Sequence, residues 1–145
     1  MLFSEVCCYV CGILSEGGDF VKQFAIKENH LFSKAYAKGK KAITHTVCVY
    51  VLPDYHASRL QRAHPLKLRI NRVGFTVTKK LGGAPLRNRA KRVMREAYYK
   101  AQKEYNVKTG QLVVIAARGA ATKAKTDEVF KDLTEAFRKT GMIIE

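Results

Sequence analysis

The chain has 145 residues, 47% of them hydrophobic, with 27 lysines and arginines against 12 acids, a net charge of +15 and an isoelectric point near 9.9. This length and composition predict a single globular domain and exclude a disordered basic tail. Because the positive charge exceeds what solubility requires, we expect a polyanionic partner, with nucleic acid favoured over an anionic membrane surface.

Residues 1–24 differ in composition from the rest of the chain. They hold three of the four cysteines and the pair Gly17-Gly18, so we expect a weakly ordered N-terminal extension followed by one domain over residues 25–145. Cys8 and Cys11 have the spacing of metal ligands, but no second pair or nearby histidine completes a tetrahedral site. The cysteine pattern lacks a disulfide framework and indicates a reducing, cytoplasmic location.

Export and membrane insertion are not expected from this N-terminal segment. Its apolar run, from Val6 to Leu14, is too short to span a bilayer. The run also lacks the positively charged leader of a signal peptide and carries Glu5 instead.

A helix and two strands are predicted in the first half of the domain. The helix follows His30 and ends near Lys38, with Gly39 as a C′ residue. A strand rich in β-branched residues covers 46–52, a polar connection covers 55–67, and a second strand covers 69–78. In the first strand we expect Val47, Val49 and Val51 on one side and Thr46, Cys48 and Tyr50 on the other. Residues 40–44 are a candidate edge strand.

A helix, a strand and a final helix are predicted in the second half. Pro85 suits the first turn of a helix that reaches Tyr105. The continuous apolar run 112–117 predicts a strand that is buried on both faces. Thr126 is expected to cap the last helix, which Gly141 ends. The order α-β-β-α-β-α predicts an α/β (α+β) two-layer sandwich in which helices pack on a small mixed sheet.

The helix after Pro85 carries the most informative stretch of the chain. Five of the nine residues from Arg87 to Arg95 are cationic, and Glu96 is the one acid between Lys67 and Lys103. One side of the helix gathers Asn88, Lys91, Arg92, Arg95 and Tyr99, and the opposite side gathers Leu86, Ala90, Val93, Met94, Ala97 and Ala101. A solvated helix would mix charges of both signs, so this pattern favours contact with a polyanion such as phosphate.

Two adjacent segments resemble the protein component of bacterial ribonuclease P. They are the strand and turn from Arg72 to Gly82, followed by the motif from Arg87 to Arg95, and the likeness extends over roughly residues 25–140. The resemblance implies a left-handed β-α-β crossover, of the kind found in the second domain of ribosomal protein S5. It also implies a protein that assists a catalytic RNA, which uses Mg²⁺ to remove the 5′ leader of precursor tRNA.

The resemblance assigns two groups of site residues. The group that faces the catalytic RNA comprises Lys79, Lys80, Arg87, Asn88, Arg89, Lys91, Arg92 and Arg95. The group that lines a cleft for the single-stranded leader comprises Phe32, Tyr36, Thr46, Tyr50, Thr76 and Thr78. Stacking on aromatic rings suits a leader of variable sequence. Spacing alone favours core packing for Phe32 and Tyr36, and the resemblance reverses that preference.

No catalytic group is expected in the protein itself. Its acids are not clustered as a two-metal nuclease requires, and its histidines lack triad partners, so we expect Mg²⁺ to be held mainly by the RNA. Asn88 fits either a bond within its helix or a contact with RNA or metal. The rival interpretation is a non-catalytic RNA-binding module, such as a ribosomal or tRNA-handling protein. Membrane-surface binding is weaker still, because the apolar side of the arginine helix has few large anchors.

Overall fold

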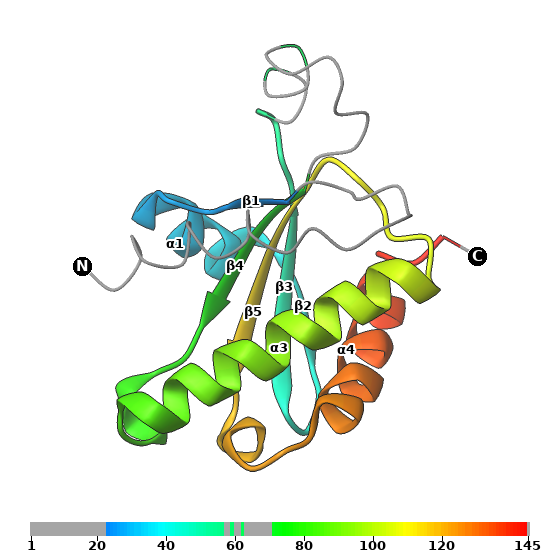
Figure 1. The fold of residues 1–145 in the computed structure, drawn as a ribbon. Coiled ribbons are helices and arrows are strands. Elements are labelled where there is room, and N and C mark those ends of the chain that lie inside the picture. Colours follow the sequence, from blue (N-terminus) through cyan, green and yellow to red (C-terminus); the bar gives the residue numbers. More distant parts are fainter. Residues whose placement is uncertain (1–22, 57–58, 60–61, 63–70, 145) are drawn as a thin grey trace.

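The computed structural model describes residues 23–56, 59, 62 and 71–144, and its strands form one five-stranded mixed sheet in the order β1-β4-β5-β3-β2 (Figure 1). The strands are β1 (Gln23–Ala25), β2 (Lys40–Ile43), β3 (Val47–Pro53), β4 (Asn71–Thr76) and β5 (Gln111–Ala117). The helices are α1 (Asn29–Lys38), α3 (Ala84–Glu104) and α4 (Thr126–Thr140), with short 3₁₀ helices η2 (Lys79–Leu81) and η3 (Gly119–Thr122).

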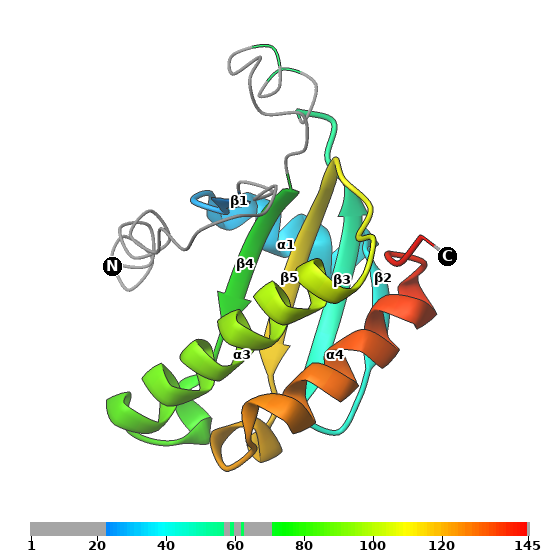
Figure 2. The same cartoon turned by 45° about the vertical axis from the view of Figure 1, so that its right-hand side comes forward.

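Helices cover both faces of the sheet, to different extents. Helices α3 and α4 lie side by side across one face, and α1 covers part of the other (Figures 1 and 2). The alternation of β3 explains this division, since Val47 and Val49 pack toward α3 and α4 whereas Leu52 packs beneath α1. The apolar strand β5 supplies both cores, as its continuous hydrophobic sequence predicted, with Val113 in one and Val114 in the other.

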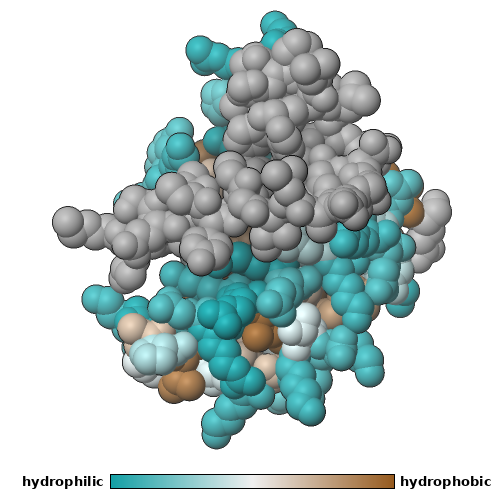
Figure 3. Space-filling view, viewed as in Figure 1, coloured by the Kyte–Doolittle hydropathy of each residue, from teal (hydrophilic) through white to brown (hydrophobic). Residues whose placement is uncertain are grey.

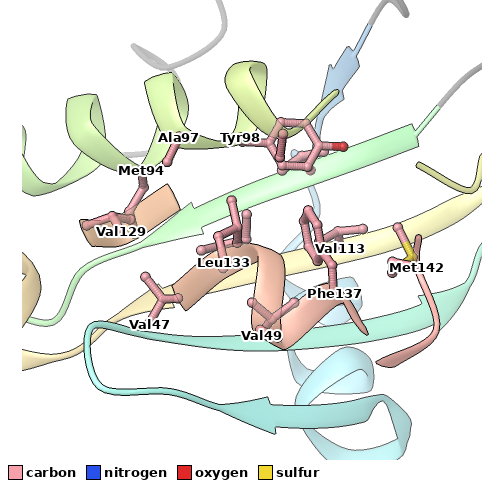
Figure 4. Packing of buried hydrophobic residues seen from close by; sticks show 14 of the residues in the cluster. Val47, Val49, Met94, Ala97, Tyr98, Val113, Val129, Leu133, Phe137 and Met142 are labelled. Carbon is pink, nitrogen blue, oxygen red and sulfur yellow. The ribbon is translucent and has the colours of Figure 1, made fainter. Parts of the chain in front are cut away.

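The larger core lies between the sheet and the two long helices, and Tyr98 of α3 is fully buried in it (Figure 4). Its ring stands edge-on between Phe75 and Phe137, with centroids 6.2 and 5.9 Å away. Complete burial raises the pKa of Tyr98, and its hydroxyl accepts a hydrogen bond from Gln102 at 3.2 Å. Tyr98 was not among the residues predicted for the apolar side of this helix, although it lies four residues after Met94 and three before Ala101 and so shares their face.

The smaller core lies under α1 and depends on one glycine. Phe32, Leu31 and Ala35 pack against Ile26 and the even-numbered positions of β3 and β5. A Cβ atom at Gly74 would stand 2.5 and 2.7 Å from the ring of Phe32, so the aromatic ring occupies the space that a side chain in β4 would fill. Gly74 therefore sets how closely α1 approaches the sheet.

The connection between the parallel strands β4 and β5 has unusual handedness. When α3 lies in front of the sheet and both strands run downward, β5 lies to the right of β4 (Figures 1 and 2). The crossover through α3 is therefore left-handed, as the family resemblance implied, whereas almost all such connections are right-handed. The predicted order of elements from α1 onward and the mixed sheet are likewise confirmed, including β2 as an edge strand.

Several boundaries differ from the predictions for physical reasons. Strand β1 was missed because it is three residues long, and it pairs in parallel with β4 at one edge of the sheet. Gly39 ends α1 in an extended conformation (φ −71°) instead of the left-handed one. A glycine is needed there because a Cβ would lie 2.4 Å from the carbonyl oxygen of Ala35. Thr126 is the first residue of α4, after the cap at Lys125, and its hydroxyl donates to Glu96.

Some predictions concern segments outside the described residues. These are the weak order of the extension before Gln23, most of the 55–67 connection and the start of the strand predicted at residue 69. Within the described parts of the chain, none of the helices has the length and apolar character that crossing a bilayer requires.

Candidate nucleic-acid interface

Helix α3 presents its charged side away from the core, as its amphipathic pattern predicted. It starts after Gly83 with Pro85 in its first turn, and its buried residues are Ala90, Val93, Met94, Ala97, Tyr98 and Ala101. Asn88 and Arg92 are exposed on the outward side. Leu86 differs from the prediction: it is 45% exposed, because the first turn of the helix runs beyond the sheet and covers Gly82 instead.

Arg87, Lys91 and Arg95 form a row on the flank of α3 that faces away from α4, which we call the basic row. They follow one another at intervals of four residues and are each half-buried. The Nε atoms of Arg87 and Arg95 are buried and have no hydrogen-bond partner among the described residues. Three cations thus lie adjacent with no acid between them, an arrangement that costs stability until an anion neutralises it.

The pKa values of the basic row also indicate that its charges are unfavourable in the absence of an anion. Partial burial holds the pKa of the Lys91 ammonium below its usual range, and repulsion by Arg95 and then Arg87 adds to this. The pKa of Arg95 is likewise lowered, mainly by burial, while nearby Tyr99 acts in the opposite sense. A bound phosphate would relieve both the desolvation and the repulsion, because it supplies acceptors and negative charge together.

The opposite flank of α3 has a structural task. Arg89 donates from Nη1 to the carbonyl oxygen of Thr122 in η3 at 2.8 Å, and Lys100 pairs with Asp127 of α4 at 2.8 Å. Arg89 therefore fixes the start of α3 to the segment that precedes α4. Arg89 is exposed, but its bond to Thr122 already uses one of its guanidinium donors. The sequence motif could not indicate this bond.

The segment between β4 and α3 leads from the sheet to the helix that carries the basic row. Thr76 ends β4, and the exposed residues Thr78, Lys79 and Lys80 lead through η2 to the turn at Gly82. Gly82 has φ +134°, a conformation that favours glycine. On the face seen in Figure 3, hydrophilic side chains predominate below the grey atoms, where Figure 1 places α3.

On the α1 side of the sheet, Tyr36, Tyr50 and Thr76 form a second surface, which we call the aromatic face. The rings of Tyr36 and Tyr50 meet edge to face with centroids 4.8 Å apart. The hydroxyl groups of Tyr36 and Thr76 lie 3.2 Å apart and share a hydrogen bond. These two neighbours hold the side chain of Tyr36 in place. Because the residue is 43% exposed, its ring is still open to a ligand. This arrangement provides a fixed stacking surface.

The next row of side chains extends the aromatic face along the sheet. Strand pairing places Ile43, Cys48, Ala116 and Thr76 in one row across β2, β3, β5 and β4. A hydrogen bond with Cys48 and partial burial raise the pKa of Tyr50 to about 12. Lys41 lies over the ring of Tyr50, with Nζ 5.7 Å from the centroid. A cation therefore stands at the border of the aromatic surface.

The residues predicted to line the leader cleft thus separate in the structure. Tyr36, Tyr50 and Thr76 come together, whereas Thr78 is exposed beyond the end of β4. Phe32 is 8% exposed and belongs to the core under α1.

Thr46 does not belong with these residues, and its assignment to the cleft is wrong. It is 2% exposed, and its hydroxyl donates to Asp132 of α4 at 2.6 Å, on the opposite side of the sheet from α1. It precedes the first residue of β3, so strand alternation does not govern where its side chain points.

Lys41 is the contact that the sequence analysis missed. Its position over Tyr50 follows from the register of β2 against β3, where the two residues are direct partners. The candidate edge strand at residues 40–44 was the available signal, but its register could not be read from the sequence.

Among the described residues, no group of three or more histidine, cysteine, aspartate or glutamate side chains is placed to hold a metal ion. A buried ion pair joins Asp54 to Arg72, which donates to the carboxylate from Nη2 at 2.7 Å. Burial raises the pKa of Asp54, but the bonds from Arg72 and from the His56 backbone outweigh it and leave the pKa below its usual value. The carboxylate is thus already satisfied by protein donors.

Comparison with known proteins gives a consistent result. A family model described as Ribonuclease P matches residues 20–141. The ribonuclease P protein component of Clostridium acetobutylicum is 30% identical over 124 residues, which cover 86% of this chain and 94% of that protein. The component of Bacillus cereus is 32% identical over 124 residues, with 86% and 93% covered. The solved structure of the Staphylococcus aureus RNase P protein has the same fold, with a TM-score of 0.64 at 24% identity, covering 85% of this chain and 100% of that one.

Proposed function

The chain belongs to the family of ribonuclease P protein components, and from this premise we propose that it binds the catalytic RNA of ribonuclease P and the 5′ leader of precursor tRNA. In that role it promotes the Mg²⁺-dependent endonucleolytic removal of the leader in the cytoplasm. The basic row is the observation that carries the proposal, since it combines three like charges with two buried donors that lack partners in the described part of the chain.

The basic side of α3, together with the two lysines of η2, is the proposed docking surface for the catalytic RNA. Its members are Lys79, Lys80, Arg87, Asn88, Arg92, Lys91 and Arg95, with Arg89 contributing the donors that Thr122 leaves free. Guanidinium groups grip phosphate oxygens through paired hydrogen bonds. A helix that holds such groups in fixed positions loses little side-chain freedom on binding, which supports recognition of a folded RNA backbone.

The aromatic face is the proposed binding surface for the leader. Tyr36 offers an open ring beside Tyr50, and Lys41 supplies a cation for the backbone of a bound strand. Stacking and phosphate contacts tolerate any base sequence, as a variable leader requires. Phe32 supports this surface from beneath by positioning α1, instead of touching the leader with its full ring.

We assign the bond cleavage itself to the RNA. Mg²⁺ needs oxygen ligands with near-octahedral geometry, which RNA phosphates can provide, and it would activate water for attack on the phosphodiester. The protein would contribute by neutralising phosphate repulsion, so that the RNA holds Mg²⁺ at lower ionic strength, and by favouring precursor over mature tRNA.

Single-turnover cleavage of a precursor tRNA by a bacterial ribonuclease P RNA tests the proposal. At low Mg²⁺ we expect the protein to increase the cleavage rate, and we expect this stimulation to diminish as the leader is shortened. An absence of stimulation, combined with tight binding to a different RNA, would contradict the proposal and favour a plain RNA-binding module.

Tyr36→Ala should reduce the preference for precursor over mature tRNA by about 5- to 150-fold, because one stacked base contributes about 1–3 kcal/mol. Tyr36→Phe keeps the ring and loses only the bond to Thr76, so it should retain most of the preference. Dissociation constants of the reconstituted enzyme for both tRNAs measure this effect. Equal losses in the two variants would show that the hydroxyl, and not stacking, is responsible.

A further inference from the structure

We propose that Tyr55 and Lys34 form a second stacking site for the leader, which binds nucleotides farther from the cleavage point than those on the aromatic face. We call this pair the distal site. The inference rests on the proposed function, because it assigns the leader as the occupant. It adds a residue outside the family motif and predicts how affinity depends on leader length.

The exposure of Tyr55 is the first observation. It is 78% exposed, more than any other large hydrophobic residue in the described part of the chain. Lys34 of α1 lies over its ring, with Nζ 5.5 Å from the centroid. The cation covers one side of the ring, so a face remains open to a base, and the lysine can meet an adjacent phosphate.

The backbone that carries Tyr55 is firmly anchored, which is the second observation. The side chain of the preceding residue, Asp54, is 3% exposed and accepts two hydrogen bonds from Arg72. Asp54 also accepts the backbone N–H of His56 at 3.0 Å and donates its own N–H to Gly110 at 3.1 Å. In the chain, Tyr55 thus lies between two residues whose positions are fixed by hydrogen bonds. An aromatic ring presented on a fixed turn loses little entropy when it binds a ligand.

The third observation is that the distal site repeats the arrangement at the aromatic face. A lysine lies over a tyrosine in both places, Lys41 over Tyr50 and Lys34 over Tyr55, at nearly equal distances of 5.7 and 5.5 Å. Tyr50 lies in the middle of β3 and Tyr55 lies two residues beyond its end, so the rise along an extended chain separates them by at most about 17 Å. An extended single strand of a few nucleotides covers such a distance.

The charge of the intervening surface suits a nucleic acid strand. The segment from Lys27 to Lys41 contains five lysines and a single acid, Glu28, which pairs with His30 at 3.1 Å. Lys34 and Lys38 are both exposed on α1. A phosphate backbone that runs from Tyr50 toward Tyr55 would meet cations along its path, and a protein partner would gain less from so uniform a charge.

The test measures binding of precursor tRNAs to the reconstituted enzyme while the leader is lengthened one nucleotide at a time. With the unmodified protein we expect affinity to rise in two stages, one for each stacking surface. Tyr55→Ala should abolish the second stage, with a loss of about 5- to 150-fold for long leaders and none for short ones. Tyr55→Phe, which keeps the ring, should restore the second stage.

The outcomes separate the two proposals. If short leaders are favoured over none but Tyr55→Ala binds long leaders as tightly as the unmodified protein, the distal site is wrong and the proposed function stands. A loss of the same size for short and long leaders would also overturn the distal site. If the unmodified protein does not distinguish precursor from mature tRNA at all, the proposed function itself fails. Thermal unfolding of Tyr55→Ala, whose ring is exposed, should match that of the unmodified protein.

Discussion

Replacing Lys91 and Arg95 together by glutamine is expected to weaken binding to the catalytic RNA about 150-fold at moderate salt. Each charge-assisted contact contributes about 1.5 kcal/mol, and the two together correspond to this factor. The slope of log affinity against log salt should decrease by about 0.7–0.9 for each phosphate contact removed. Binding measured over a range of salt concentrations gives both quantities, and an unchanged slope would contradict phosphate contacts by these residues.

The same variant should make the free protein more stable. The pKa of Lys91 is lowered in the folded state, so the unfolded chain holds that proton more tightly. The folded state is therefore penalised at every pH below the folded pKa, and the penalty is relieved as pH rises through that value toward the unfolded one. Glutamine removes the charge and should raise the midpoint of thermal unfolding at neutral pH. A lower midpoint would show that the row is not under electrostatic strain.

Arg89→Gln provides a matched comparison within the same helix. Arg89 bonds to Thr122, so its loss should lower the stability of the free protein, in contrast to the effect expected for Lys91 and Arg95. If both variants stabilise or both destabilise the free protein, the division of α3 into a binding flank and a structural flank is wrong.

Phe32→Ala should cost about 3–5 kcal/mol of the free energy of unfolding, as expected for the loss of a buried phenyl ring. The ring is 8% exposed, belongs to the core under α1 and fills the space above Gly74. Loss of leader discrimination should follow from displacement of α1 and its Tyr36. Denaturant unfolding measures the stability, and leader binding should be compared at a temperature where the variant stays folded. A stable variant that loses only leader affinity would contradict this assignment.

Gly74→Ala tests the same packing from the opposite side. Its new Cβ would approach the ring of Phe32 to 2.5 Å, and overpacking of this kind costs about 1–3 kcal/mol. Phe32→Leu shortens the side chain at the point of collision. We therefore expect Gly74→Ala to cost less in the Phe32→Leu background than in the unmodified protein, and additive costs would show that the two residues do not compete for space.

Local sequence patterns predicted much of this fold. The apolar side of α3, the division of β3 into Val47 and Val49 on one face and Tyr50 on the other, and the double burial of β5 all follow from periodicity. These features depend on residues a few positions apart, and the geometry of the helix or strand fixes the directions in which their side chains point. The charge of α3 and the resemblance of its motif likewise indicated the family before any long-range contact was known.

The tertiary structure decided which side chains remain available to a ligand. Phe32 and Tyr36 share one side of α1 in the sequence, yet Gly74 admits one ring into the core and Thr76 holds the other at the surface. Thr46 and Arg89 are likewise bound to partners 86 and 33 positions away. Such contacts depend on the register of strands and the approach of helices, which no local period encodes. The sequence alone therefore determined the elements and the charge of the surface, and the packing between elements decided the exposure and hydrogen bonding of each site residue.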